Sequence, residues 1–119
     1  SEFASDNLVT LSASDLPTNS FGFFLTSMNQ GFTGNPGGSQ GNLCLAGSIG
    51  RYVGAGQILN AGAAGSFTLP LDLNQTPTPT GLVAIGVGET WNFQAWFRDP
   101  AGGGTGFDLS NGLAVSFVL

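Results

Sequence analysis

Short runs that alternate or are uniformly apolar, separated by glycine- and proline-rich turns, constrain the fold of this chain more than any other feature. The clearest run is TWNFQAWFR at 90–98. Its side chains alternate between an apolar set, Trp91, Phe93, Ala95 and Phe97, and a second set, Asn92, Gln94, Trp96 and Arg98. Alternation with a period of two places successive side chains on opposite faces of a strand. Because no amphipathic helical stretch accompanies these runs, the sequence predicts an all-β fold.

Strand-like runs recur at fairly even spacing along the whole chain. They lie at 8–12, 21–27, 42–47, 51–56, 66–73, 82–87, 90–98 and 113–119, with turn-forming sequences such as NAGAAG and DPAGGGTG between them. About eight short strands with such turns predict a two-sheet antiparallel β-sandwich, jelly-roll or immunoglobulin-like, with a barrel as the alternative. Pro70 cannot donate to a strand ladder, so its strand is expected at a sheet edge or at a bulge.

The length of the chain fits one domain. At 119 residues it can bury a real core without a disulfide or metal. TPTPT at 76–80 is similar to linkers between modules, but a boundary there would leave too short a second unit, so it is interpreted as an extended loop. Residues 1–3 are interpreted as a vector remnant, and residues 4–119 as a single module taken from a larger protein.

The charge composition excludes several kinds of partner. Charged residues make up 8% of the chain, lysine is absent, and Arg51 and Arg98 are the only cations against a net charge of -5. A phosphate backbone would find almost nothing to pair with, so no nucleic-acid partner is expected. For the same reason the chain has too few cations to bind an anionic membrane surface. It also contains no run of about 18 apolar residues that could span a bilayer, so no membrane partner is expected.

The same composition removes most catalytic chemistry. Without histidine or lysine the chain lacks the base of a Ser-His-Asp, Cys-His or Ser-Lys site and the His/Cys ligand sets of zinc, copper or haem sites. Glu89 and Asp99 could be imagined as a glycosidase pair, but they stand at opposite ends of one predicted strand, roughly 30 Å apart. The protein is therefore not expected to be an enzyme, although other carboxylate pairs are unconstrained.

No cofactor is predicted. A calcium site from Asp72, Asp99 or Asp108 with loop carbonyls is physically possible, but no calcium-loop spacing supports it. Turn-forming and strand-ending aspartates explain these residues more simply. Cys44 stands alone between two leucines, which predicts a small buried side chain, and a single cysteine leaves the redox compartment open.

The second side of the 90–98 run is the candidate ligand face. If it faces solvent, it presents the flat indole of Trp96 flanked by the amides of Asn92 and Gln94 and the guanidinium of Arg98. The apolar C–H face of a sugar ring suits stacking on an indole, and its hydroxyls suit planar amides and a guanidinium. The alternative is structural: Trp96 half-buried under a loop, Arg98 paired with a carboxylate, and the amides bonded to turn backbone.

Three more residues are candidates for the binding surface. Trp91 is expected in the core, but it is kept because either phase of the strand leaves one tryptophan exposed. Tyr52, the only tyrosine, lies among glycines, where it can either cover backbone or face a ligand. Gln30 is a weaker candidate for the rim of a site.

Three segments together carry a family resemblance: FGFFLTSMNQGF, NPGGSQGNLCLAGSIGRY and GETWNFQAWFRD. The pattern, from about Phe21 to Asp99, resembles the β-sandwich carbohydrate-binding module of a soil-metagenome endoglucanase, and more broadly a module of large secreted and surface-attached bacterial proteins. The resemblance implies a secreted, extracellular, non-catalytic module. It implies binding of β-1,4-linked plant glucans, such as cellulose, cello-oligosaccharides, xyloglucan or mixed-linkage glucan. No binding residue is carried over from the family.

The expected partners are therefore a β-glucan and a covalently linked glycoside hydrolase such as an endoglucanase, and the module itself is expected to be a monomer. The alternative is a structural or adhesive β-sandwich module of a bacterial surface or secreted protein, with no sugar site. An independent hydrolase is the least favoured hypothesis, because the sequence offers no suitably placed carboxylate pair.

Overall fold

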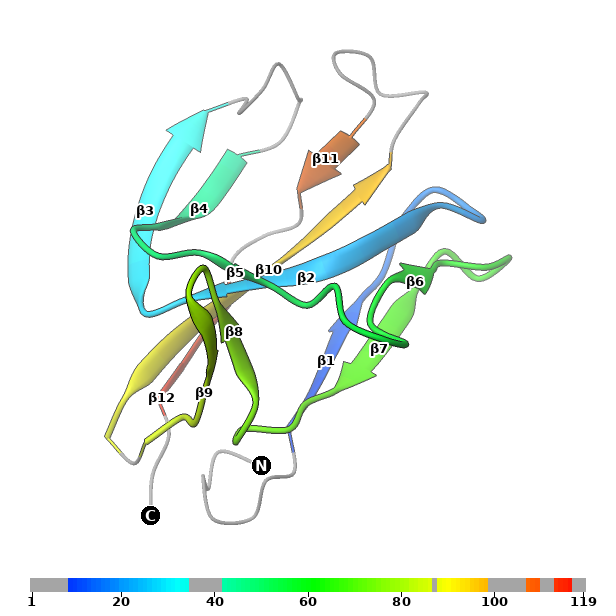
Figure 1. Cartoon of the computed structure of the whole chain (residues 1–119). Helices are drawn as coiled ribbons and strands as arrows, with labels where there is room; N and C mark the ends of the chain where they lie inside the picture. Colours follow the sequence, from blue (N-terminus) through cyan, green and yellow to red (C-terminus); the bar gives the residue numbers. More distant parts are fainter. Residues whose placement is uncertain (1–8, 35–41, 87, 99–106, 110–112, 117–119) are drawn as a thin grey trace.

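The computed structural model describes residues 9–34, 42–86, 88–98, 107–109 and 113–116 (Figure 1). These residues form antiparallel strand pairs and no helix, so the predicted all-β class is confirmed. The described part contains twelve strands, ten of them three residues or longer, which exceeds the expected eight. They are β1 (Thr10–Ala13), β2 (Phe21–Ser27), β3 (Asn29–Gly34), β4 (Asn42–Ala46), β5 (Gly50–Arg51), β6 (Leu59–Asn60), β7 (Phe67–Pro70), β8 (Thr76–Thr78), β9 (Gly81–Val83), β10 (Thr90–Arg98), β11 (Phe107–Leu109) and β12 (Leu113–Ser116).

A six-stranded sheet built around β10 and β2 is the centre of the fold. β10 spans the predicted 90–98 run, pairs with β2 along one edge, and pairs with β11 and β12 on the other. β2 in turn pairs with β5 and β6. The register sets Trp96 opposite Phe23 and Asn92 opposite Ser27. Directly opposed residues in an antiparallel pair share a face, so the two alternating sets of β10 are continued across the sheet by β2.

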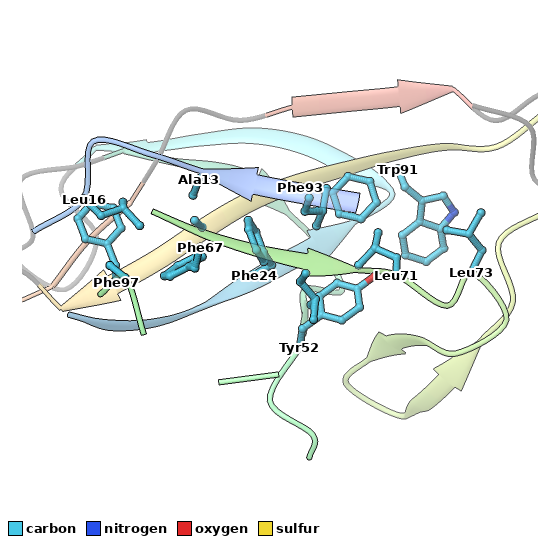
Figure 2. Close-up of a cluster of buried hydrophobic side chains, with 14 of the residues drawn as sticks. Ala13, Leu16, Phe24, Tyr52, Phe67, Leu71, Leu73, Trp91, Phe93 and Phe97 are labelled. Atoms are coloured by element: carbon cyan, nitrogen blue, oxygen red, sulfur yellow. The ribbon is translucent and has the colours of Figure 1, made fainter. Parts of the chain in front are cut away.

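The main core lies between this sheet and the two-stranded β1–β7 sheet (Figure 2). From β10 it receives the set predicted to be apolar, and Trp91 is confirmed as a core residue at 4% exposure. The alternating leucines and phenylalanine of the 66–73 run are also confirmed as buried. The main cluster comprises Leu11, Ala13, Leu16, Phe24, Tyr52, Ala61, Phe67, Leu69, Leu71, Leu73, Ile85, Trp91, Phe93, Ala95 and Phe97.

Pro70 ends β7, whose described ladder partner is β1 alone. A strand with one ladder partner has a free edge, and proline is tolerated there because its missing N–H breaks no second ladder. The predicted edge position of Pro70 is therefore confirmed. The alternating residues expected at 113–119 cannot be compared in the same way, because the side chains of that segment lie outside the described part of the chain.

The sequence predicts an extended loop for TPTPT at 76–80, but the first part of this segment forms a strand. Thr76–Thr78 forms β8, which pairs with β9 in a separate two-stranded sheet. β8 crosses β5 so closely that a Cβ added at Gly50 would overlap the carbonyl oxygen of Pro77. Threonine favours extended backbone and proline is tolerated on an edge strand, so this sequence can form a short hairpin.

The β3–β4 pair lies over the face of the six-stranded sheet that points away from the main core. β3 and β4 are antiparallel, with a register shift between Gln30 and Thr33. The backbone N–H of Cys44 in β4 donates to the side chain of Gln94 in β10. Leu25 and Leu45 are buried but do not belong to the main cluster. The central sheet is thus covered on both faces, by β1–β7 and, in part, by β3–β4.

Within the described ranges, no helix has the length and apolarity needed to cross a membrane.

Candidate ligand-binding groove

The face of the six-stranded sheet opposite the main core, here called the outer face, carries an open hollow. β2 contributes Phe23 and Leu25 to it, β10 contributes Trp96, and β5 contributes Arg51. β4 closes one side with Leu43. The hollow has a volume of about 330 Å³ and is called the groove below. Its lining residues are Phe23, Leu25, Leu43, Ile49, Arg51, Trp96 and Leu109.

Trp96 and Phe23 form the aromatic part of the groove. Their ring centroids are 4.9 Å apart and their planes differ by 20°, as expected for an offset stack between directly opposed residues. The guanidinium carbon of Arg98 lies 5.4 Å from the centroid of the Trp96 ring, within the range of a cation–π contact. Trp96 is half-buried, which is the state that the structural alternative predicted, and the ring still borders the groove.

The prediction that Asn92 and Gln94 face solvent is wrong. Their side chains point to the outer face, but they are only 4% and 2% exposed. The Asn92 amide nitrogen donates to the carbonyl of Ser27 at 3.0 Å, and the Gln94 oxygen accepts the N–H of Cys44 at 3.0 Å. Strand alternation assigns a side chain to a face but does not reveal whether a distant segment covers that face. Here these amides hold neighbouring backbone instead of forming an open platform.

Tyr52 also does not reach a ligand surface. It is 1% exposed and belongs to the main core, where Figure 2 places it near Leu71. Its buried hydroxyl makes no hydrogen bond to a described residue. Burial raises the pKa of Tyr52 to about 12, and the Thr76 side chain, which lies near the phenol without meeting hydrogen-bond geometry, lowers it by less. Of the two possibilities that the sequence left open, the buried one is therefore found.

Trp91 and Gln30 likewise lie outside the groove. The Trp91 indole nitrogen donates to Glu89 Oε1 at 3.3 Å, and the same oxygen accepts the N–H of Gly86 at 2.5 Å. Glu89 therefore ties the entry of β10 to the preceding turn. Asp99, its imagined catalytic partner, lies outside the described residues. Gln30 is exposed on β3 opposite Leu45, and it is not part of the groove lining.

Both cations of the chain belong to the outer face. Arg51 lines the groove, and Arg98 covers the ring of Trp96. Both are exposed, and neither forms an ion pair within the described residues. Sequence reasoning singled out Arg98 but not Arg51, although the scarcity of cations was visible in the composition. It also missed Leu43 and Ile49, because the segments that bring them to the groove are distant from β10 along the chain.

The described residues offer little for metal binding. No group of three or more His, Cys, Asp or Glu side chains comes together among them. Asp72, one of the three aspartates considered for calcium, accepts the N–H of Asn74 at 3.0 Å in a turn. Asp99 and the side chain of Asp108 lie outside the described part of the chain. Cys44, predicted to be buried, is half-buried, because the neighbouring Leu45 takes the enclosed position on β4.

A second hollow, of about 470 Å³, lies at the end of β1. It is lined by the turn from Ser12 to Leu16 together with Phe97 and Leu109. Asp15 in this turn has a positive φ of 58°. The lining of this hollow is more polar than that of the groove, and Phe97 is the one aromatic residue among the described residues that line it, so these form no aromatic stack and the groove is the stronger candidate site.

Comparisons with protein-family models, with curated proteins and with solved structures give no match for this chain.

Proposed function

We propose that this protein is a non-catalytic carbohydrate-binding module that binds β-1,4-linked plant glucans in the groove. The observation that carries the proposal is the combination on one open face of a Trp96–Phe23 stack and the guanidinium groups of Arg51 and Arg98. Aromatic rings can contact the apolar face of a sugar, and guanidinium groups can donate to its hydroxyls. This division between apolar and polar contacts is what an uncharged, hydroxyl-rich chain requires.

The groove differs from the flat platform that the sequence suggested. Because Phe23 and Trp96 stack on each other, only part of each ring remains for a ligand. Leu43 and Ile49 widen the apolar surface, and the two arginines take over the polar role expected of Asn92 and Gln94. Binding is therefore expected to be weak for each sugar and to increase with chain length, as an open groove accumulates contacts.

The wider context belongs to the same proposal. The strand pairing and the core between β1–β7 and the central sheet support a β-sandwich architecture. The resemblance noted in the sequence supports attachment to a glycoside hydrolase, secretion, and a role in holding that enzyme against β-glucan. None of these three properties depends on the module having catalytic groups of its own.

The proposal is tested by affinity electrophoresis in gels that contain hydroxyethyl cellulose, xyloglucan, xylan or mannan. Retardation is expected with the first two polysaccharides and should be lost in Trp96→Ala. Leu82→Ala is the matched control, because Leu82 is 64% exposed on β9 and does not line the groove. No retardation in any gel, together with no heat of binding to cellohexaose at millimolar concentration, would refute a β-glucan site.

A second candidate is a structural or adhesive module without a sugar site. The burial of Asn92 and Gln94 favours it, since half of the predicted polar face is committed to internal hydrogen bonds. If Trp96→Ala lowers the melting temperature of a protein that binds none of the four polysaccharides, this second candidate is the better explanation.

A further inference from the structure

The two arginines of the outer face indicate which glycans the groove prefers. The chain has a net charge of -5 and no lysine or histidine, so Arg51 and Arg98 are its entire supply of positive charge. They come from different strands, β5 and β10, that are separated in the sheet by β2. Nevertheless both project on the outer face, one lining the groove and the other next to its tryptophan.

Among the described residues, neither arginine has a carboxylate partner that would explain its place. Arg98 makes no ion pair with a described carboxylate, and its recorded contact is the ring of Trp96. Arg51 also lacks an ion pair in the described part of the chain. Two of the carboxylates are engaged elsewhere: Glu89 accepts from Trp91, and Asp72 accepts from Asn74. Within the described part of the chain, therefore, no carboxylate neutralises either guanidinium group.

The spacing of the two arginines suits an extended chain with repeated charges. Arg51 pairs with Leu25, and Arg98 follows the Phe97–Gly22 pair by one residue. From strand rise and strand separation, their Cα atoms lie roughly 16 Å apart across the sheet. Several consecutive sugars span such a distance, and the aromatic stack lies between the two ends.

We propose that the groove selects glycan chains that carry carboxylates, as in chains with uronic acid units, over neutral chains of the same backbone. This proposal rests on the proposed function, because it names the preferred ligand of the same site. A guanidinium donates two parallel hydrogen bonds to the two oxygens of a carboxylate and attracts its charge, whereas a neutral hydroxyl has one oxygen and cannot match this fork. Since the rest of the protein is acidic and repels anions, the preference depends on these two side chains alone.

The test compares two ligands with the same backbone that differ at C6, where one carries a neutral hydroxymethyl group and the other a carboxylate. Cellohexaose and the hexamer of the same linkage in which every C6 is oxidised to a carboxylate are titrated by calorimetry. We expect the oxidised hexamer to bind about three- to tenfold more tightly at about 20 mM salt, as two exposed charge pairs would give. The advantage should shrink towards parity at about 500 mM salt, where exposed charges are screened.

Variants of Arg51 and Arg98 test whether these two side chains cause the preference for the oxidised hexamer. Arg51→Gln/Arg98→Gln should bind both hexamers with similar affinity, while Arg51→Lys/Arg98→Lys should retain part of the preference. The double glutamine change makes the protein more negative by two charges, so the matched control is Asn74→Asp/Gln75→Glu, which adds the same charge in an exposed turn next to the core residue Leu73. This control should keep the wild-type preference. Melting curves check that each variant is folded.

The possible results separate the two proposals. If cellohexaose binds and the oxidised hexamer binds equally or less tightly, the carboxylate preference is refuted and the β-glucan site stands. A preference that persists in Arg51→Gln/Arg98→Gln also refutes it, because other groups would then be responsible. If neither hexamer binds at millimolar concentration, the proposed function fails and the preference fails with it.

Discussion

The side-chain oxygen of Gln94 accepts a hydrogen bond from the backbone N–H of Cys44, at 3.0 Å and across a separation of 50 residues. This contact fastens β4 to the outer face of the central sheet, and β4 supplies Leu43 to the groove. A buried amide that is bonded in this way is costly to lose, because removing it leaves a donor in an enclosed site. Gln94 is therefore a positioning residue for the groove.

Replacing Gln94 by leucine should destabilise the protein by about 1–3 kcal/mol, because the Cys44 N–H loses its side-chain acceptor. Urea unfolding measures the change in free energy. Gln75→Leu is the matched control, because Gln75 is exposed in a turn, and it should stay within about 0.5 kcal/mol of wild type. Equal stability of Gln94→Leu and wild type would contradict the structural role assigned to this amide.

Because the pKa of the buried Tyr52 phenol is raised, we expect the folded protein to lose stability at high pH. Its pKa is raised from 10.0 to about 12 in the folded protein, so between these values the unfolded chain gives up the phenol proton while the folded one retains it. Stability should then fall as the pH rises, by about 1.4 kcal/mol between about pH 9 and about pH 11. Urea unfolding at the two pH values measures this difference.

Tyr52→Phe supplies the control for that pH dependence. The variant should lose this part of the alkaline destabilisation, and near neutral pH it should be at least as stable as wild type, since it removes a buried hydroxyl that has no hydrogen-bond partner among the described residues. Because the chain has one tyrosine, phenolate absorbance titrates Tyr52 directly. A phenolate that forms in the folded protein with an ordinary pKa near 10 would show that the side chain is not enclosed.

These residues also show how far the sequence can predict the fold. The limits of β10 were predicted at 90–98, and its core set is buried as expected, because strand alternation is a local property that the residues carry themselves. β8 was missed, since two prolines in five residues indicate a loop, although an edge strand tolerates them. The short strands β5 and β6 depend on pairing with β2, which no local pattern reveals.

The site was predicted less well than the fold for the same reason. Trp96 and Arg98 were identified on the right face of β10, but Asn92 and Gln94 were expected in solvent. Their burial results from β4 and from neighbouring backbone, which reach them through long-range contacts. The place of Arg51 on the same face depends on the register between β5 and β2, which the alternation of a single strand does not supply.

The close crossing of β5 and β8 leaves no room for a side chain larger than that of glycine at Gly50. A Cβ at Gly50 would overlap the carbonyl of Pro77, so Gly50→Ala should force the β8–β9 hairpin away from the sheet and cost on the order of 1–3 kcal/mol. Thermal unfolding measures the effect. Gly54→Ala is the matched control, because the nearest atom there, at 3.0 Å, is the flexible end of Gln57. Equal melting temperatures for the two variants would contradict the close crossing.

The central claim is that a glucan chain binds on the outer face beside Trp96, and the two tryptophans provide the most direct test. Trp91 is buried in the core and Trp96 borders the groove, so Trp91→Phe and Trp96→Phe each leave one tryptophan as a reporter for one face of the sheet. The measurement is tryptophan emission during titration with cellohexaose. We predict a saturable change in Trp91→Phe and none in Trp96→Phe. A saturable change in Trp96→Phe alone, or no change in either variant at millimolar ligand, would contradict the account.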